Sequence, residues 1–468
     1  MLTISPGVVE AGRARLPVHL AETWILRAGA VALPLAVWPV GDDVFVLAKA
    51  AVLGLLVTAL LALRVLRLAA ASEPAARRRP GTPLDLPLAA FVASAALSTV
   101  LSPAAGTALL GARYRYEGLL TIVAYALLFR LAAQALDGRE ARGVVRALLL
   151  GGFVVAALAV VQSLVETALI GGATEETART FGGSLRATST FGNAGTLGAF
   201  LAMLAPLALD ELLRARSAAD RLLAGNVAIV VVLALVLTYS RAAWLGAGLG
   251  IAVVAAGPAA RLCRRRPWTA PAAAALVLPC LAVAVRVAPP WTRSVLERAA
   301  SLADPTQGSG ATRLHIWADT LHLVAARPLV GWGPDTFGLV FPRFQTGDWT
   351  PGFLIDKAHS DLLQVAATQG LLGAAAYVAV AAAFVAAFWR GRARPGAPAL
   401  LAAWLAYQVP LQLDFSWLPS AAPAWLLMAA AVATWRGGER RVNEFGRPRH
   451  TWYTLGHGRA GDGRQGAG

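Results

Sequence analysis

Charged residues are scarce in this chain of 468 residues: they make up 15% of it, whereas 57% of the residues are hydrophobic. A soluble domain carries roughly 25% charged residues. Apolar runs of about 20 residues recur along the chain, and each is long enough to cross the hydrocarbon core of a membrane as a helix. The composition therefore excludes a soluble globular fold. Continuous apolar runs also exclude an outer-membrane barrel, whose strands alternate over about 10 residues.

Lysine and cysteine are nearly absent as well. Lys49 and Lys357 are the only lysines, so arginine supplies almost all of the positive charge behind the net +16. The two cysteines, Cys263 and Cys280, suggest no redox or metal role. The N-terminus has no cleavable signal pattern, because the first apolar run follows about 20 mixed residues. We therefore expect the mature chain to keep its first helix.

The apolar runs predict an all-α polytopic membrane protein with about 12 transmembrane helices. The predicted spans are 24–40, 44–63, 86–105, 118–136, 147–168, 191–209, 222–239, 243–260, 268–288, 361–388, 397–413 and 419–435.

Arginine clusters occur in every second loop between these spans. Cytoplasmic loops are enriched in Lys and Arg, so this alternation predicts that both termini are cytoplasmic. The expected location is the plasma (inner) membrane. It also explains the basic balance without nucleic acid. The clusters are Arg13–Arg15, Arg77–Arg79, Arg139–Arg146, Arg214–Arg221, Arg261–Arg266 and Arg390–Arg394.

One large extracytoplasmic loop is predicted between helices 9 and 10. Its acidic and basic residues balance, which suits a folded subdomain, and long loops escape the charge rule. The predicted organisation is then a cytoplasmic N-terminus (1–23), membrane helices 1–9 (24–288), the loop subdomain (289–360), membrane helices 10–12 (361–435) and a disordered basic cytoplasmic tail (436–468).

Within the loop, the segment "TRLHIWADTLHLVAARPLVGWGPDTF" predicts an amphipathic helix that ends before Pro328. Leu314, Trp317, Leu321 and Val324 fall on one helical face. The helix could lie on the membrane surface, or it could pack on the outer ends of the spans. The sequence leaves both possibilities open.

His359 is the one histidine placed where the long loop enters a spanning helix, in the stretch "DKAHSDLLQVAATQG". If Ser360 or Asp361 caps that helix, its positive end disfavours a charged imidazole. A neutral imidazole can accept a proton, so His359 is a candidate general base. The alternative is an interfacial histidine bonded to loop backbone.

Several arginines lie on the predicted outer side, where the charge rule disfavours them. Arg241 follows Ser240 in "TYSRAAWLG", Arg186 precedes a span, and Arg313 opens the loop helix. Arginine binds phosphate through two parallel hydrogen bonds, so arginines that converge would bind a pyrophosphate. Taken singly, each could instead reach lipid headgroups or form a local salt bridge. Arg113 and Arg115 alternate with tyrosines, which is typical of an interfacial belt.

Four stretches of the chain together resemble the O-antigen ligase/polymerase superfamily of bacterial membrane glycosyltransferases. They are "GARYRYEGLLTIVAYALLF", "STFGNAGTLGAFLAMLAPLAL", "TYSRAAWLGAGLG" and "RLHIWADTLHLVAARPLVGWGPDTF…AHSDLLQVAATQGLLGAAAY", in the family's order. The last stretch is the most specific. It combines an Arg-x-x-x-Trp helix, a Pro-Leu-x-Gly-x-Gly turn and a histidine before a glycine-containing helix.

The resemblance implies transfer of a glycan from a polyprenyl-pyrophosphate carrier to an acceptor hydroxyl on the outer face of the membrane, without metal or other cofactor. It implies that His359 is the catalytic base. It further implies that Ser240-Arg241 and Arg313 hold the pyrophosphate, with Arg186 as a further candidate. Ser360 replaces the asparagine that commonly follows the histidine in this family, which leaves the acceptor open.

Other functions are compatible with the same sequence. Within the family they are a glycan polymerase, with a second lipid-linked glycan as acceptor, and a protein O-oligosaccharyltransferase. The alternative from another class is a transporter of lipid-linked sugar or a small anion. A transporter needs charges at mid-membrane depth. Few lie inside the predicted spans, chiefly Lys49, Arg130 and Arg286, which favours an enzyme.

Overall fold

The computed structural model describes residues 6–40, 42–69, 81–165, 185–265, 309–346 and 354–436. The predicted span 268–288 and the basic tail after residue 436 lie outside the described residues, as do 289–308 and 347–353 of the predicted loop subdomain.

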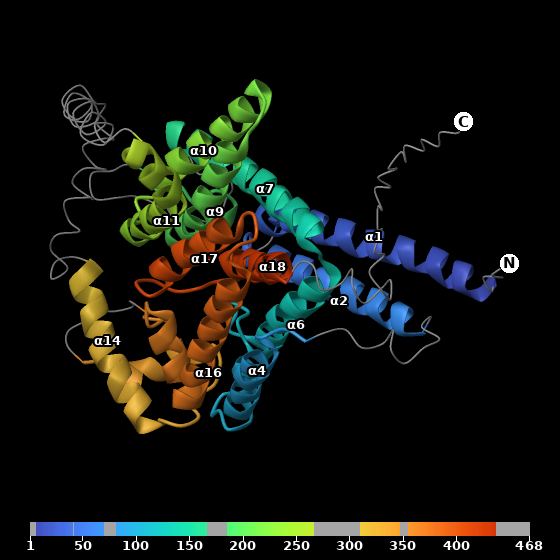
Figure 1. Cartoon of the computed structure of the whole chain (residues 1–468). Coiled ribbons are helices and arrows are strands. Elements are labelled where there is room, and N and C mark those ends of the chain that lie inside the picture. The colour runs from blue at the N-terminus through green and yellow to red at the C-terminus, as the bar shows by residue number, and fades with distance from the viewer. Residues whose placement is uncertain are drawn as a thin grey trace, which may run out of the picture.

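Helices make up most of the described residues and form a bundle, with α14 at one edge (Figure 1). Short 3₁₀ turns occupy Ser189–Phe191 and Phe341–Arg343. The helices are α1 (Pro6–Leu35), α2 (Val46–Ala69), α4 (Asp85–Val100), α5 (Ala105–Leu110), α6 (Leu119–Ala135), α7 (Gly138–Leu164), α9 (Ala194–Arg214), α10 (Ala218–Leu237), α11 (Arg241–Arg265), α14 (Ser309–Ala326), α15 (Phe337–Val340), α16 (Asp361–Gly391), α17 (Ala397–Leu411) and α18 (Leu418–Trp435).

Every predicted span other than 268–288 overlaps one of these helices, so the all-α, multi-pass architecture is confirmed. Among the described residues, 7 helices are long and apolar enough to cross a membrane. The helices α4, α6 and α17 are apolar but shorter. The total of about 12 spans therefore stays a prediction.

The centre of the bundle is α18 (Figure 1), which is buried along almost its whole length and contacts α6, α7, α17 and α16. Its sequence, LPSAAPAWLLMAAAVATW, is rich in alanine. Small side chains let neighbouring helices approach closely, which is how helices associate inside a membrane. The helix α9 is also deeply buried and packs against α11, α17 and α10.

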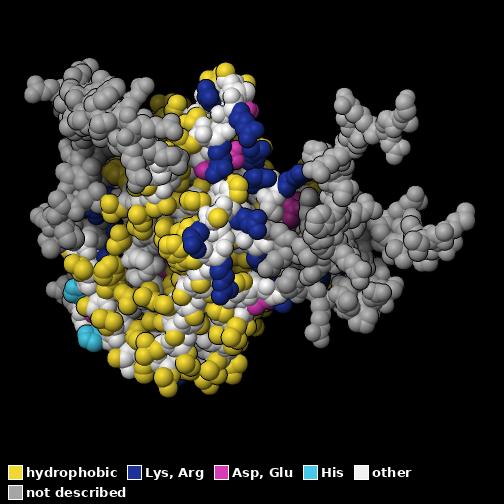
Figure 2. All heavy atoms as spheres, in the orientation of Figure 1, with side chains coloured by type: hydrophobic (Ala, Val, Ile, Leu, Met, Phe, Trp, Pro, Cys, Tyr) yellow, Lys and Arg dark blue, Asp and Glu magenta, His cyan; other side chains and the backbone are white. Residues whose placement is uncertain are grey.

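Hydrophobic side chains cover most of the described surface in Figure 2, especially the part where Figure 1 places α4 and α16. Lys and Arg gather instead toward the region of α7 and α10. A wide apolar surface of this kind suits a lipid environment.

The helix α16 is interrupted at Gly370, whose φ of +70° and ψ of −173° are not helical. The turn that follows α14 inserts at this break. The N–H of Gly333 donates to the carbonyl of Thr368 at 2.8 Å, and the N–H of Leu371 donates to the carbonyl of Pro328 at 2.7 Å. These bonds pair backbone groups near the break, which would be costly to leave unpaired inside a membrane bundle.

The predicted loop helix is confirmed as α14, and it ends before Pro328. The face that carries Leu314 and Leu321 is not the one that packs against the rest of the protein. Leu314 and Leu321 are exposed, whereas Ile316 and Leu323 are buried in a cluster that includes residues of α16 and of the loop before it. Apolar residues therefore occur on both faces of α14, and periodicity alone could not tell which face packs against the protein.

Candidate active site

The imidazole of His359 faces a carboxylate from another loop. Its Nδ1 lies 3.2 Å from Oδ1 of Asp414, which stands between α17 and α18. The ring also meets Phe415 edge to face, with 5.4 Å between the ring centres. About 30% of the His359 side chain is exposed, so the ring is held on one side and reachable on the other.

The start of α16 is tied to the loop that carries Asp414. The helix begins at Asp361, and Ser360 in the N-cap position makes no capping hydrogen bond through its side chain. The carboxylate of Asp361 instead accepts a hydrogen bond of 2.7 Å from the N–H of Ser416. The cap that we expected from Ser360 or Asp361 is therefore replaced by a bond between loops, which fixes Asp414 relative to His359.

Arg313 of α14 reaches the same carboxylate. Its Nη2 lies 4.0 Å from Oδ2 of Asp414. The start of α9 approaches from another side, because a Cβ atom on Gly195 would lie only 2.4 Å from Oδ2 of Asp414. Asn193, two residues earlier, caps α9 by accepting from the N–H of Thr196. A glycine at position 195 thus leaves the room that Asp414 occupies.

Arg186 and Arg241 complete the group. The Nε of Arg186 donates to the carbonyl of Thr238 at 3.1 Å, which joins the segment before α9 to the end of α10. Burial lowers the pKa of Arg186, and the charge of Asp414 offsets part of this effect. Arg313 lies close enough to interact electrostatically with both Arg186 and Arg241. Arg186 and Arg313 thus lie near Asp414, the carboxylate that faces the imidazole, and Arg241 lies near Arg313.

Ser240 lies in the turn between α10 and α11 and is buried. Its N–H donates to Oγ1 of Thr238 at 3.2 Å, and its carbonyl accepts from the N–H of Trp244 in the first turn of α11. A Cβ atom on Gly198 of α9 would lie 3.0 Å from the Cβ of Ser240. In this structure Ser240 shapes the turn that presents Arg241.

Asp414 is the member of this group that sequence reasoning missed. It is a lone acid in the short segment "LQLDFSW", and no motif marks it. The available signal was its position: a carboxylate in a short loop between two apolar spans, on the side already predicted to hold the outer arginines.

Backbone strain gathers in the loops around the site. The non-glycine residues with positive φ in the described part of the chain include His359 itself, Tyr239 before Ser240-Arg241, and Ser189 before α9. Such conformations cost about 1–3 kcal/mol each and persist where surrounding contacts enforce them. The remaining ones are Tyr114, Tyr116 and Asp335.

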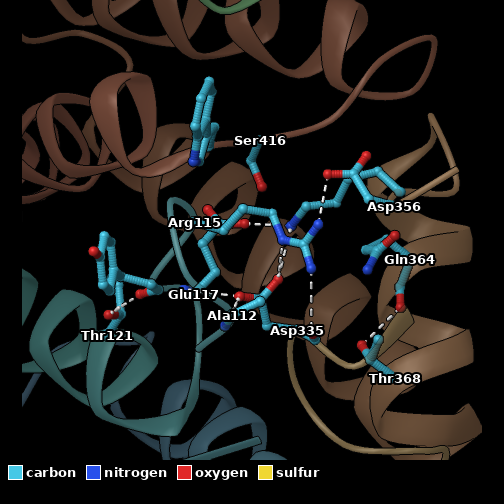
Figure 3. A network of polar contacts seen from close by, with 12 residues as sticks. Ala112, Arg115, Glu117, Thr121, Asp335, Asp356, Gln364, Thr368 and Ser416 are labelled. Carbon is cyan, nitrogen blue, oxygen red and sulfur yellow. Dashed lines mark hydrogen bonds and ion pairs between the residues drawn. The ribbon is translucent and has the colours of Figure 1, made fainter. Parts of the chain in front are cut away.

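Arg115 does not belong to an interfacial belt, so that interpretation was wrong for this residue. Only 14% of its side chain is exposed, and it forms ion pairs with Asp335 at 2.9 Å and Asp356 at 2.5 Å (Figure 3). Arg113, by contrast, is 69% exposed, pairs with an exposed aspartate and packs over the Tyr114 ring. The segment in which Arg and Tyr alternate thus contains one exposed arginine, Arg113, and one mostly buried arginine, Arg115.

A cavity of about 160 Å³ adjoins this second group of charges, between α4, α6, α16, α17 and α18. Glu117, Asp335 and Lys357 line it, as do Asp361 and Ser416. The bond that ties α16 to the loop of Asp414 therefore forms part of the cavity wall.

Lys49 is hydrogen-bonded to the segment before α9. It is fully buried, and its Nζ donates to the carbonyls of Thr190 at 2.6 Å, Ala36 at 2.7 Å and Phe45 at 3.3 Å. These bonds connect the end of α1, the start of α2 and the 3₁₀ turn before Asn193. The contacts of Lys49 are those of a structural anchor.

The described residues contain no group of three or more His, Cys, Asp and Glu side chains placed to hold a metal ion. A family model described as O-antigen ligase matches residues 226–378. This part of the chain is similar to the O-antigen ligase family. The match runs from α10 to α16 and includes Ser240, Arg241, Arg313 and His359. A search of curated proteins found no match to the chain.

The family match confirms the resemblance on which the sequence analysis relied. Together with the apolar helices, the match supports a multi-pass membrane protein of the O-antigen ligase/polymerase type. Arg186 and Asp414 lie outside the matched residues. The folded chain nevertheless brings them to His359, through the loops before α9 and between α17 and α18.

Proposed function

We propose that this protein transfers a glycan from a polyprenyl-pyrophosphate carrier to an acceptor hydroxyl. The observation that carries the proposal is the partly exposed His359–Asp414 pair with Arg313 4.0 Å from the same carboxylate. Arg186 and Arg241 lie close enough to Arg313 to interact with it electrostatically. A base and a group of phosphate-binding side chains in one place are what this reaction requires.

Arg241, Arg313 and Arg186 bind the pyrophosphate of the donor in this proposal. Guanidinium groups bind phosphate oxygens through paired, charge-assisted hydrogen bonds. Their positive charge also stabilises the negative charge that builds up on the leaving pyrophosphate in the transition state. Ser240 contributes by setting the turn before Arg241.

His359 acts as the general base, and Asp414 sets its tautomer. If Nδ1 carries the hydrogen and donates it to Asp414, Nε2 keeps its lone pair for the acceptor proton. Asp414 then stabilises the imidazolium that forms. The 3.2 Å contact between Nδ1 and the carboxylate supports this assignment.

The bond changes balance without a further reactant. The acceptor oxygen gives its proton to Nε2 of His359 and bonds to the anomeric carbon. The bond between that carbon and the pyrophosphate oxygen breaks, and the polyprenyl pyrophosphate leaves with the electron pair. A single displacement of this kind inverts the anomeric configuration.

We place this site on the outer face of the plasma membrane, with both termini in the cytoplasm and residues 289–360 outside. The arginine clusters of alternate loops support that orientation. The contacts of Lys49 and Arg130 favour an enzyme over a transporter. Lys49 binds backbone carbonyls, and Arg130 pairs with Asp85 at 2.5 Å.

The test is transfer by the purified protein, with lipid-linked glycan extracted from the expressing cells as donor and no added metal. Lipid, glycan and hydroxyl-bearing peptide acceptors are offered in separate reactions. Glycosylated product with inverted configuration supports the proposal, and the acceptor that reacts distinguishes a ligase from a polymerase or a protein O-oligosaccharyltransferase. Movement of the intact donor across the membrane of vesicles that contain the protein, without glycan transfer, would overturn the proposal in favour of a transporter.

A further inference from the structure

We propose that five charged side chains away from the reacting atoms hold the catalytic loop in its active geometry. They are Arg115, Glu117, Asp335, Asp356 and Lys357, named here the charge cluster. They act as positioning residues for His359, and the inference rests on the proposed role of His359 as the base.

The loop before α16 needs such support. His359 adopts a φ of +50°, a conformation that a side chain other than glycine disfavours. Its own side chain meets Asp414 in one hydrogen bond, and its carbonyl accepts from Nε1 of Trp317 at a long 3.3 Å. Contacts made by the residues just before His359 add to these two bonds.

Lys357, two residues before His359, supplies the strongest of these contacts. Only 4% of its side chain is exposed. Its Nζ lies 2.5 Å from Oε2 of Glu117 and 3.6 Å from Oδ1 of Asp335. Burial alone lowers the pKa of Lys357, but the charges of Glu117 and Asp335 outweigh this and raise it. The ammonium therefore stays charged and paired inside the protein.

Asp356, the next residue back, is held in the same way. Arg115 bridges two acids: its Nε lies 2.9 Å from Oδ1 of Asp335, and its Nη1 lies 2.5 Å from Oδ2 of Asp356 (Figure 3). The second oxygen of Asp335 accepts from the N–H of Ala112 at 2.6 Å. Three loops are thus joined: 111–118, 333–336 and 354–360.

This arrangement fixes both partners of the His–Asp pair. The charge cluster holds the loop on the N-terminal side of His359, and the bond from Ser416 to Asp361 holds the loop that carries Asp414. Buried ion pairs add little net stability but define a single geometry when each group is paired. A displacement of about 1 Å at a catalytic base can lower the rate ~100-fold.

The test compares Lys357→Met with a matched control, Arg67→Met. Arg67 also forms a mostly buried ion pair, 2.7 Å from Glu22, but on α2 and outside the site. Hydrogen exchange of residues 354–360 is followed by mass spectrometry. We expect faster exchange there in Lys357→Met and no change in Arg67→Met.

The catalytic readout separates positioning from general destabilisation. Binding sites are counted by titration with undecaprenyl pyrophosphate, and the transfer rate is expressed per binding site. Lys357→Met should lower that rate ~100-fold with an unchanged Kd for undecaprenyl pyrophosphate. A merely structural role would lower the number of sites and the total rate together, leaving the rate per site unchanged.

A double variant decides whether Lys357 acts through His359. Adding Lys357→Met to His359→Ala should cost no further activity. Unchanged exchange at 354–360, an unchanged rate per site, or full additivity would overturn the charge-cluster inference alone. A fully active His359→Ala would overturn the proposed base, and the inference with it. If Lys357→Met does not fold, Glu117→Gln, which keeps the size of the side chain, takes its place in each comparison.

Discussion

At the scale of the residue, Asp414 contacts both the imidazole of His359 and the guanidinium of Arg313. One carboxylate oxygen of Asp414 lies 4.0 Å from the guanidinium of Arg313. The same carboxylate faces His359 through its other oxygen. Asp414 therefore links the proposed base to the proposed phosphate-binding Arg313, and substitutions should separate its effect on catalysis from its effect on donor binding.

Asp414→Asn should lower kcat about 100-fold without weakening binding of undecaprenyl pyrophosphate. The amide no longer stabilises the imidazolium, and it does not enforce the required tautomer. Loss of a negative charge beside the arginines favours a pyrophosphate. Transfer rates and Kd values measured on the same preparation check both parts. Weaker binding with an unchanged kcat would contradict this role of Asp414.

Arg313→Gln should raise the Kd for undecaprenyl pyrophosphate by at least about 10-fold, because a charged hydrogen-bond donor to phosphate is lost. Arg343→Gln is the matched control, since Arg343 is an exposed arginine of the same loop region. Equal loss of affinity in both variants would indicate nonspecific electrostatic binding and not a site built around Arg313.

The raised pKa of Glu117 makes the protein less stable as the pH rises. Burial raises its pKa to about 7, and the charge of Lys357 offsets only part of that effect while Asp335 and Asp361 add to it. The folded protein then binds this proton more tightly than the unfolded chain. The contribution of Glu117 to stability is therefore greatest below its ordinary pKa and falls as the pH rises toward 7.

Melting temperatures in detergent between pH 5 and 8 check this dependence, with Glu117→Gln as the comparison. The wild-type protein should lose melting temperature relative to Glu117→Gln as the pH rises from 5 to 7, and the difference should level off above 7. A difference that is constant or grows in the opposite direction contradicts a raised pKa for Glu117.

At the scale of the element, the break in α16 fixes the position of α14 relative to α16. The turn Pro328–Gly333 fits between the two parts of the helix, and its hydrogen bonds fix the end of α14 against α16. Arg313 lies on α14, and His359 immediately precedes α16. The distance between Arg313 and His359, the proposed pyrophosphate-binding arginine and base, thus depends on this insertion.

Gly370→Ala should lower the free energy of unfolding by more than about 2 kcal/mol, because it places a side chain at φ of +70° and drives a Cβ toward the Leu329 carbonyl. Its Cβ would lie 2.2 Å from that oxygen. Gly248→Ala is the control, since no atom lies within 4 Å of a Cβ built there. Thermal unfolding of the two variants measures the difference, and equal stability would contradict the close approach at the break.

The sequence predicted the helices well and their contacts poorly, for physical reasons. Apolar runs reveal spans because each must cover a hydrocarbon thickness. Side chains on those runs do not reveal their partners: α14 has leucines on exposed and buried faces alike. The family resemblance pointed to His359 and the arginines. Asp414 could be identified only from the structure, in which the packing of α9, α17 and α18 brings it to His359.

At the scale of the whole molecule, loops far apart in sequence meet at one place. Lys357 pairs with Glu117 across 240 positions, and His359 meets Asp414 across 55. No local pattern encodes such pairs, because they exist only when α4, α6, α16 and α18 pack together. Arg186, Arg241 and Arg313, which the charge rule disfavours on the predicted outer side, are close enough to interact with one another through Arg313.

The most direct measurement of the central claim is the transfer rate of His359→Ala beside His322→Ala. His322 is an exposed histidine of α14, so its loss controls for histidine removal from the same region. We expect His359→Ala to lose at least about 100-fold in kcat while it binds undecaprenyl pyrophosphate normally, and His322→Ala to match the wild type. Full transfer by His359→Ala would contradict the account.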